Sequence, residues 1–138
     1  ACFGAPFLPL HPGQYAEMLG KKMKEENVTV WMINTGWSGG PYGIGNRMKL
    51  SYTRNMITAA LNGELNDIEF EVHPIFGMLI PKRCPNVPIN ILNPRYTWAD
   101  REAYDTSAKN LAQQFVKNFE KYATGVSDEI LAAAPKTK

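Results

Sequence analysis

A glycine-rich stretch at residues 35–46 has the clearest chemical potential in the chain, because five of its twelve residues are glycine. Glycine lets backbone N–H groups approach an anion closely, and loops of this kind hold phosphate groups. The spacing differs from the phosphate-binding motif G-x-x-x-x-G-K-[ST], since no Gly-Lys pair is followed by Ser or Thr. It also differs from the dinucleotide fingerprint, because no long helix is expected directly after it. The stretch is either a ligand-contacting loop or a plain mobile turn, and composition does not decide between them.

Two polar side chains after the glycine-rich stretch suit a nucleotide. Arg47 has a planar guanidinium, which stacks on a base or pairs with a phosphate. Thr53, six residues later, can donate or accept one hydrogen bond at the start of a helix. The other interpretation is a solvent-exposed arginine and an ordinary first-turn threonine, and the residues alone leave both open.

Metal and thiol chemistry are not indicated by the sequence. His11 and His73 each stand beside a proline, without a second histidine or a carboxylate cluster at metal-ligand spacing. His73 is therefore predicted to be an ordinary strand residue. Cys2 has no neighbouring base and is predicted to be a buried, inert thiol. Two cysteines, Cys2 and Cys84, are too few for a disulfide scaffold or a zinc site, and this fits a reducing, cytoplasmic location.

The charged clusters are interpreted as solvated. Lys82 and Arg83 belong to a proline-rich loop, and Asp100, Glu102 and Asp105 are expected on the solvent face of a helix rather than as paired catalytic carboxylates. The net charge is +2 and the basic residues are scattered, which excludes a nucleic-acid binder that relies on a concentrated basic face. No apolar run approaches the ~20 residues that span a bilayer, so no membrane partner is expected.

Hydrophobic periodicity predicts the helices that position these residues, at 12–26, 52–62, 98–124 and 128–134. The expected N-caps of the last three are Ser51, Thr97 and Ser127. The expected C-terminal stops are Asn27, Gly63 and Gly125. The long helix carries an apolar stripe that is predicted to face the core: Tyr104, Ala108, Leu111, Phe115, Phe119 and Tyr122.

The strand pattern predicts the fold class. Residues 28–34 are β-branched, aromatic and apolar on both faces, which is typical of a buried strand with helices on both sides. A short strand is expected at 47–50, and one or two strands at 70–80 with a break at His73–Pro74. The chain is therefore predicted to be α/β, with a mixed sheet and flanking helices. Its core is expected to be incomplete, because such strands need more sheet and more helix than this segment offers.

Length and chain ends bear on domain organisation. The chain has 138 residues, of which 44% are hydrophobic and 20% charged, and this corresponds to one globular domain at most. It begins without methionine and with an apolar stretch, so we expect a piece of a longer chain, whereas the last residues look like a true C-terminus.

Several of these stretches together resemble the ATP-dependent phosphoenolpyruvate carboxykinase family. The resemblance is carried by A-C-F-G-A-P-F-L-P-L-H-P at 1–12, N-T-G-W-S-G-G-P-Y-G-I-G at 34–45, Y-T-R at 52–54, A-A-L-N-G-E-L at 59–65 and L-N-P-R at 92–95. It spans essentially the whole chain and is to the C-terminal part of the family only. Residues 1–138 are thus expected to be the C-terminal segment of a larger carboxykinase-type nucleotide-binding domain.

The resemblance implies the chemistry of the whole enzyme. Family members convert oxaloacetate and ATP into phosphoenolpyruvate, carbon dioxide and ADP during gluconeogenesis, using Mg²⁺ and Mn²⁺. The family's phosphate-binding loop, its catalytic lysine and its Mn²⁺ ligands lie before Ala1, so no catalytic or metal-binding residue is expected here. The expected partners are oxaloacetate or phosphoenolpyruvate, the adenine nucleotide and the missing N-terminal part of the enzyme.

The resemblance also implies three nucleotide contacts, at Arg47, Met48 and Thr53. The family usually has lysine before this arginine, and Asn46 stands there instead, which removes one positive charge near the nucleotide. Two other hypotheses are a free-standing α/β module that binds an anion or nucleotide without catalysis, and a structural segment that docks on a partner chain.

Overall fold

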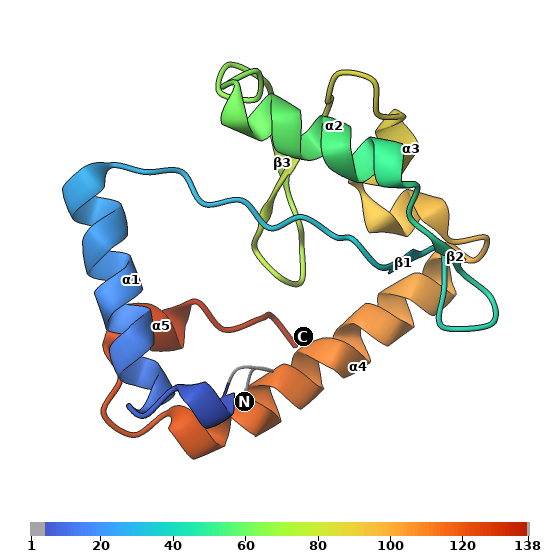
Figure 1. Cartoon of the computed structure of the whole chain (residues 1–138). Coiled ribbons are helices and arrows are strands. Elements are labelled where there is room, and N and C mark those ends of the chain that lie inside the picture. Colours follow the sequence, from blue (N-terminus) through green and yellow to red (C-terminus); the bar gives the residue numbers. More distant parts are fainter. Residues whose placement is uncertain (1–4, 138) are drawn as a thin grey trace.

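The computed structural model describes residues 5–137, and helices are its main elements (Figure 1). The helical elements are η1 (Ala5–Phe7), α1 (Pro12–Glu26), α2 (Leu50–Leu61), α3 (Ile89–Leu92), η2 (Pro94–Thr97), α4 (Arg101–Phe119), η3 (Glu120–Tyr122) and α5 (Asp128–Ala132), where η marks a 3₁₀ helix. The strands are β1 (Trp37–Ser38), β2 (Asn46–Arg47), β3 (Phe70–Val72) and β4 (Leu79–Pro81). Cys2 lies outside the described residues, so the expectation for its thiol stays a prediction.

Helix α1 confirms the helix predicted after His11. Nδ1 of His11 accepts a hydrogen bond from the backbone N–H of Gly13 at 3.2 Å, which caps the first turn. Asn27 ends the helix in the left-handed conformation, with φ of 47°. Helix α2 begins at Leu50, two residues earlier than predicted, and the N–H groups of Tyr52 and Thr53 already donate to the carbonyl of Lys49. Lys49 is therefore the N-cap, and the prediction of Ser51 is wrong.

The N-terminus of α4 also differs from the prediction. Asp100 is its N-cap, and the Asp100 carboxylate accepts from the N–H groups of Glu102 and Ala103 at 2.8 and 3.0 Å. Thr97 does not cap the helix, because it lies at the end of η2 and α4 begins only at Arg101. Its hydroxyl instead donates to the carbonyl of Pro94 at 2.7 Å within η2.

The strands form two separate antiparallel hairpins. β1 pairs with β2, with Trp37 opposite Arg47, and β3 pairs with β4, with Glu71 opposite Ile80. The predicted buried strand at residues 28–34 is wrong for this structure, because the segment is extended but pairs with no strand among residues 5–137. The fold is thus a mixture of helices and small antiparallel sheets, as in part of an α/β domain, rather than one mixed sheet with helices on both faces.

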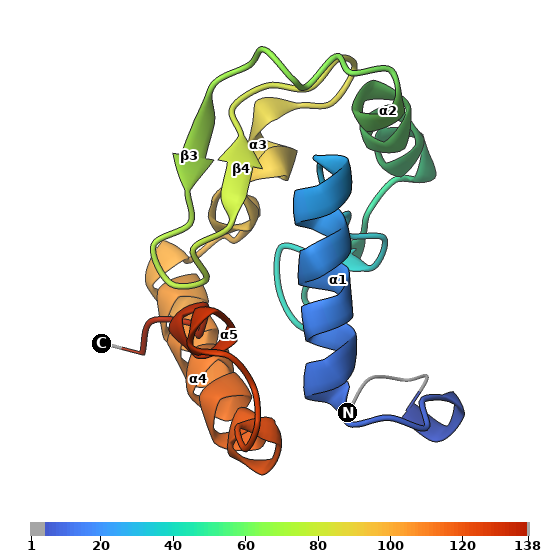
Figure 2. The ribbon, with the colours of Figure 1, turned by 90° about the vertical axis from the view of Figure 1, so that its left-hand side faces the viewer.

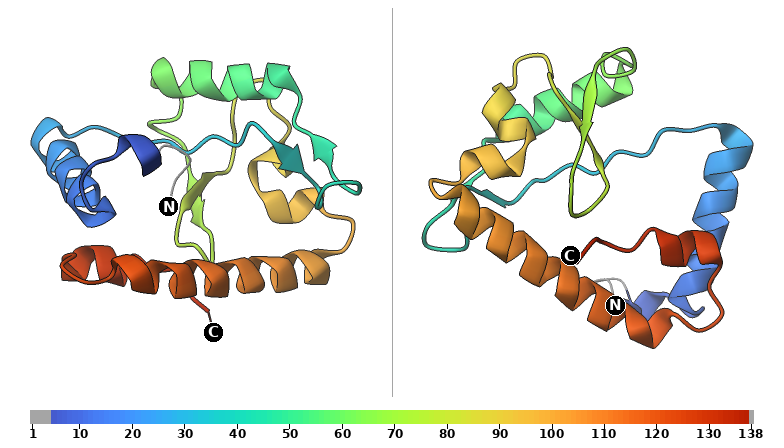
Figure 3. Two further views of the ribbon diagram at one scale, coloured as in Figure 1. Left: turned by 60° about the horizontal axis from the view of Figure 1, so that its bottom comes forward. Right: turned by 180° about the vertical axis from the view of Figure 1, so that it is seen from behind.

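The elements surround a small core and form an open arrangement. α2 and α4 lie on opposite sides of the β3–β4 hairpin, and α1 packs near α5 at one end (Figures 1 and 3). The buried core cluster is Ala59, Leu65, Cys84 and Val87, with Trp31, Tyr52, Met56, Ala60, Ile68, Ile91 and Leu92 packed against it. On the predicted stripe of α4, Tyr104 and Ala108 are buried, but Leu111 and Phe115 remain 44% and 50% exposed. The stripe is therefore only partly covered, as expected for an incomplete core.

None of the helices described in residues 5–137 is long and apolar enough to cross a membrane.

Candidate functional site

The glycine-rich stretch forms the loop of the β1–β2 hairpin. The carbonyl of Pro41 accepts hydrogen bonds from the N–H groups of Ile44 and Gly45 at 3.0 and 2.9 Å, which closes the loop. Gly43 has φ of +89°, a conformation that L side chains rarely adopt. The hairpin pairing then places Arg47 directly opposite Trp37. The loop predicted from the glycines is confirmed, and it delivers Arg47 at its C-terminal end.

Side chains fix the base of this loop. Oδ1 of Asn34 accepts from the N–H of Gly36 at 2.9 Å, and its Nδ2 donates to the carbonyl of Trp37 at 3.1 Å. The N–H of Met48 donates to the carbonyl of Gly36 at 2.8 Å. Both ends of the loop are therefore tied to Gly36, so Met48 holds a defined position beside Arg47.

The loop also approaches η2 closely at Gly39. Gly39 has φ of +84°, and a Cβ added there would lie 2.9 Å from the carbonyl oxygen of Thr97. Such a distance is too short for carbon and oxygen, so only glycine fits without movement of the backbone. A Cβ added at Gly43 would meet nothing within 4 Å. Gly39 is therefore the position where the loop rests against η2.

The structure places the three predicted nucleotide contacts on adjoining elements, with different accessibility. Arg47 ends β2, is exposed and forms no ion pair among the described residues. Met48 is half-buried in the connection to α2. Thr53 lies in the first turn of α2 and is only 6% exposed. A ligand can thus reach the exposed Arg47 side chain, whereas only a small part of Thr53 is accessible to it.

Lys49 is a further cation at this corner that the sequence reasoning did not single out. Its Nζ lies 5.6 Å from the centroid of the Tyr52 ring, and it stands two residues after Arg47. Two cations on the strand-to-helix connection favour an anionic ligand such as a nucleotide. The sequence contained a signal for this site, because Arg47 and Lys49 are only two positions apart.

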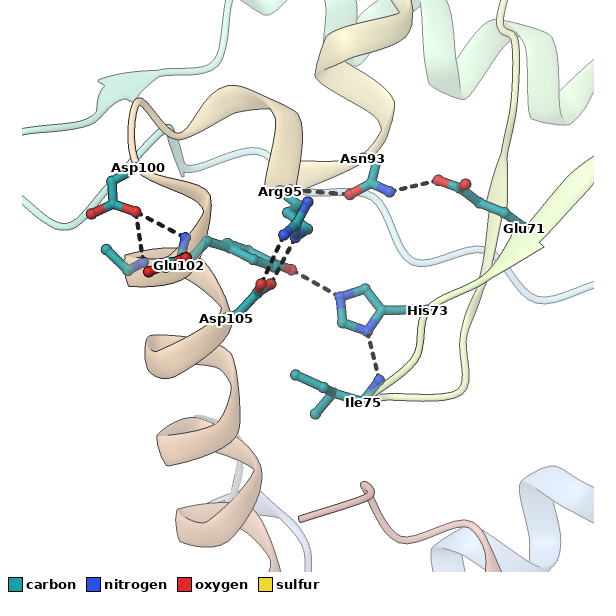
Figure 4. Close-up of polar contacts among 10 residues, drawn as sticks. Glu71, His73, Ile75, Asn93, Arg95, Asp100, Glu102 and Asp105 are labelled. Carbon is teal, nitrogen blue, oxygen red and sulfur yellow. Dashed lines mark hydrogen bonds and ion pairs between the residues drawn. The ribbon is translucent and has the colours of Figure 1, made fainter. Parts of the chain in front are cut away.

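A second polar cluster holds η2 against α4 and β3 (Figure 4). Arg95 makes a two-pronged ion pair with Asp105, in which Nε and Nη2 each lie 2.8 Å from a carboxylate oxygen. The hydrogen bond from Arg95 lowers the pKa of the Asp105 carboxyl and raises the pKa of Arg95. Asn93 donates to the Glu71 carboxylate and accepts from the N–H of Arg95. The Asp105 side chain stays 39% exposed, in line with its prediction on a solvated helix face, but it also binds Arg95, which the sequence did not predict.

Asp100 and Glu102 were predicted together with Asp105 to be solvated, and their outcomes differ. Asp100 caps α4 and is not merely solvated, whereas Glu102 is exposed as expected. The cap and the ion pair give two of the three carboxylates a structural role, and neither role is a catalytic pairing.

His73 is the buried centre of this region, at 4% exposure. Its Nδ1 accepts from the N–H groups of Ile75 and Phe76, both at 3.2 Å, so this nitrogen carries no proton. The proton is then on Nε2, which donates to Oη of Tyr104 at 2.8 Å. The prediction of an ordinary strand residue is wrong, because His73 joins the turn of the β3–β4 hairpin to α4.

The surroundings of His73 shift its titration. Burial lowers the pKa of His73, while the charges of Glu71 and Asp105 act in the opposite direction. Burial also raises the pKa of the Tyr104 hydroxyl. Both groups are therefore kept neutral, as their hydrogen bond requires.

Lys82 and Cys84, also considered from the sequence, have surroundings that indicate no catalytic role. Lys82 is half-exposed and pairs with Glu69 at 2.9 Å, which confirms the solvated interpretation. Burial raises the pKa of the Cys84 thiol, which disfavours the reactive thiolate. Two shallow concavities of about 580 and 390 Å³ lie along α4 and beside Cys84, and neither is lined by Arg47, Met48 or Thr53.

Comparison with known proteins adds the following findings. The family model described as phosphoenolpyruvate carboxykinase matches residues 1–90. The chain is 62% identical over 138 residues to phosphoenolpyruvate carboxykinase (ATP) of Flavobacterium johnsoniae, which is 100% of this chain and 26% of that protein. It is 58% identical over 135 residues to the protein of the same name from Christiangramia forsetii, and 52% identical over 138 residues to that from Thermus thermophilus. These alignments cover 98% and 100% of this chain, and 25% and 26% of the relatives. The chain thus spans about a quarter of the length of the curated relatives that it matches.

Proposed function

The chain belongs to the phosphoenolpyruvate carboxykinase family, and on that premise we propose that it is the adenine-contacting segment of an ATP-dependent carboxykinase. The complete enzyme converts oxaloacetate and ATP into phosphoenolpyruvate, carbon dioxide and ADP. One observation carries the proposal: the family match extends over residues 1–90 and so includes the hairpin loop and all three expected contacts. The alternative of a free-standing binding module is not favoured, because the relatives are about four times as long.

In this proposal Arg47 binds the nucleotide. Its exposed guanidinium stands at the end of the hairpin and has no competing carboxylate among the described residues. A planar cation over an aromatic face contributes about 0.5–2 kcal/mol, depending on how far water is excluded. Lys49 adds a second positive charge to the same corner, which offsets the loss of charge at Asn46.

Met48 and Thr53 would complete the contact with the base. Met48 presents a flexible apolar side chain, and its backbone is held by the carbonyl of Gly36. Thr53 offers a hydroxyl to a base nitrogen, and its low exposure limits this contact to one edge of the ligand.

The metal and phosphoryl-transfer chemistry is assigned to the rest of the enzyme. Among residues 5–137 no group of three or more His, Cys, Asp or Glu side chains comes together to hold a metal ion. We therefore propose no metal role for this segment, and its proposed contact is with the base of the nucleotide. We also propose that residues 1–138 form the C-terminal segment of the nucleotide-binding domain of a cytoplasmic, gluconeogenic enzyme.

The test uses a chimera in which this chain replaces the matching segment of the Flavobacterium johnsoniae relative. Arg47→Ala is expected to weaken ATP binding by about 1–2 kcal/mol, or roughly 5- to 30-fold. Arg47→Lys should recover only part of the loss, because it restores the charge without the planar group. Thr53→Val should cost about 0.5–1.5 kcal/mol, the contribution of one neutral hydrogen bond.

The control is Arg83→Ala, which removes an exposed arginine from the loop beside Cys84. Calorimetric titration of ATP and of oxaloacetate separates the two sites. Unchanged ATP affinity in Arg47→Ala, or an equal loss of oxaloacetate affinity, would return Arg47 to the interpretation of a solvated surface residue.

A further inference from the structure

The 3₁₀ helix η2 lies between the glycine-rich loop and α4, and it contacts both. We propose that Arg95 is a positioning residue for the nucleotide: its ion pair with Asp105 fixes η2, and η2 sets the position of the loop that leads to Arg47. Arg95 acts here through the backbone of η2 and not by touching the ligand. The inference rests on the proposed function, because it concerns the same nucleotide site.

The ion pair fixes the orientation of η2 as well as its distance from α4 (Figure 4). Nε and Nη2 of Arg95 each lie 2.8 Å from a different oxygen of the Asp105 carboxylate, and a planar two-pronged pair of this kind is directional. At the next residue of η2, the centroid of the Tyr96 ring lies 5.4 Å from the guanidinium carbon of Arg101, which begins α4. Two successive residues of η2 are therefore held by groups on α4.

At its C-terminal end η2 touches the loop through backbone atoms. The carbonyl oxygen of Thr97 is so close to Gly39 that a Cβ added to this glycine would lie 2.9 Å from it. Within η2 the Thr97 hydroxyl donates to the carbonyl of Pro94 at 2.7 Å, so Thr97 and Arg95 belong to one closed turn. Rotation of a side chain cannot relieve a contact between two backbones, and a shift of η2 is therefore passed to the loop.

The hairpin transmits the position of Gly39 to Arg47 over few residues. Ser38, which precedes Gly39, pairs with Asn46 across the hairpin, and the adjoining pair is Trp37 with Arg47. Antiparallel pairing holds the two strands in a fixed register. The position of η2 thus reaches the proposed nucleotide-binding arginine through one backbone contact and two strand pairs.

The pair of Arg95 and Asp105 is distinguished from the other ion pairs by its place. Among residues 5–137 it is the only ion pair in which η2 or the glycine-rich loop takes part, since the others are Lys21–Glu25, Lys24–Glu129 and Lys82–Glu69. The Lys82–Glu69 pair is a matched control, because its atoms are 2.9 Å apart and it flanks the β3–β4 hairpin without a residue of η2 or of the loop.

Calorimetric titration of the chimera tests the role of Arg95. Arg95→Ala is expected to weaken ATP binding by about 3- to 10-fold, the size of effect expected for a residue that acts without touching the ligand, and to leave oxaloacetate affinity unchanged. Lys82→Ala should leave both affinities unchanged. Unchanged ATP affinity in Arg95→Ala would overturn the inference. An equal loss in Lys82→Ala would also overturn it, because the loss would then reflect general destabilisation.

A double variant with Gly39→Ala tests the route by which Arg95 acts. Once the contact between Gly39 and Thr97 is disturbed, the position of η2 no longer determines that of the loop. The combined loss of ATP affinity should therefore be smaller than the product of the two single losses. Losses that multiply would show that Arg95 acts independently of this contact, and would overturn the inference.

Asp105→Asn provides a second variant if Arg95→Ala does not fold. It keeps the size of the side chain and removes the charge that Arg95 binds, so ATP binding should weaken by about 2- to 5-fold. Unchanged ATP affinity in this variant would overturn the inference. Arg47→Ala separates the two proposals: a chimera in which Arg47→Ala weakens ATP binding, while Arg95→Ala and Asp105→Asn do not, would refute only this inference.

Discussion

Nε2 of His73 lies 2.8 Å from Oη of Tyr104, and this contact joins the turn of the β3–β4 hairpin to the first turns of α4. Figure 2 shows the turn of the β3–β4 hairpin directed toward α4. The two residues are 31 positions apart, so their bond connects distant parts of the chain. Arg95 and Asp105 fix η2 to α4 beside it, and Gly39 rests on η2. The glycine-rich loop of the β1–β2 hairpin rests on η2, so its position depends on the polar cluster that holds η2.

Removal of the Tyr104 hydroxyl should destabilise the protein. Tyr104→Phe leaves the Nε2–H of His73 buried without an acceptor, which costs about 1–3 kcal/mol. The free energy of unfolding of the chimera, from urea titration, measures the loss. Tyr96→Phe is the control, since Tyr96 is 44% exposed. Equal stability of the two variants would show that the His73–Tyr104 bond contributes nothing.

The His73 environment predicts a dependence of stability on pH. The pKa of His73 is lowered in the folded protein by burial, so the unfolded state takes up a proton first as the pH falls. This contribution to stability is complete above the unfolded pKa of about 6.5 and decreases as the pH falls through the folded pKa. Wild-type chimera should thus lose more stability between pH 7.5 and pH 5, both chosen as assay conditions around that value, than His73→Gln does.

Glu71 on β3 and Asp105 on α4 face His73, together with the neutral Tyr104, and both carboxylates favour its protonated form. They limit the effect without reversing it, because burial is the larger influence. Denaturant melts at the two pH values give the comparison. An identical pH-dependent loss in wild type and His73→Gln would contradict the lowered pKa.

The close approach of Gly39 to Thr97 predicts different effects for two similar glycines. Gly39→Ala and Gly43→Ala both place a Cβ at positive φ, which costs about 1–2 kcal/mol. Only Gly39→Ala also brings that Cβ within 2.9 Å of the Thr97 carbonyl oxygen. It should therefore shift the hairpin and weaken ATP binding, whereas Gly43→Ala should affect stability alone. Equal ATP affinities of the two variants, measured by calorimetry, would show that the contact does not position the site.

Local signals in the sequence predicted most helices well. Asn27 and Gly125 have positive φ where helices were expected to end. Ser127 occupies the predicted N-cap position of α5, but its side chain makes no capping hydrogen bond. Cap assignment failed at α4, where Asp100 and not Thr97 is the N-cap, because the chain first forms the 3₁₀ turn η2 up to Thr97. A single sequence shows the available cap residues but not where the preceding turn ends.

Contacts between distant residues were the part that the sequence did not predict. The glycine spacing identified the hairpin loop and placed Arg47 at its end. The roles of His73 and Asp105 depend on partners from other elements, Tyr104 and Arg95, and nothing local marks such pairs. The strand predicted at residues 28–34 is wrong for the opposite reason. Its apolar pattern is typical of a buried strand, but residues 5–137 supply no neighbouring strand for it.

The chain on its own should behave as an incomplete domain. No large side chain among the described residues is fully buried, and Met32, Leu61 and Phe7 are each more than 80% exposed. We expect the isolated 138-residue chain to bind a hydrophobic dye, to melt without a cooperative transition and to show no carboxykinase activity. A cooperative melt with dispersed amide resonances would contradict the incomplete core, and turnover would contradict the assignment of catalysis to the rest of the enzyme.

The ATP dependence of phosphoenolpyruvate formation by the chimera tests the central claim most directly. The account predicts saturable turnover of oxaloacetate, with a KM for ATP that rises roughly 5- to 30-fold in Arg47→Ala while the KM for oxaloacetate stays unchanged. A folded chimera without turnover, or a KM for ATP that is the same in Arg47→Ala, would contradict it.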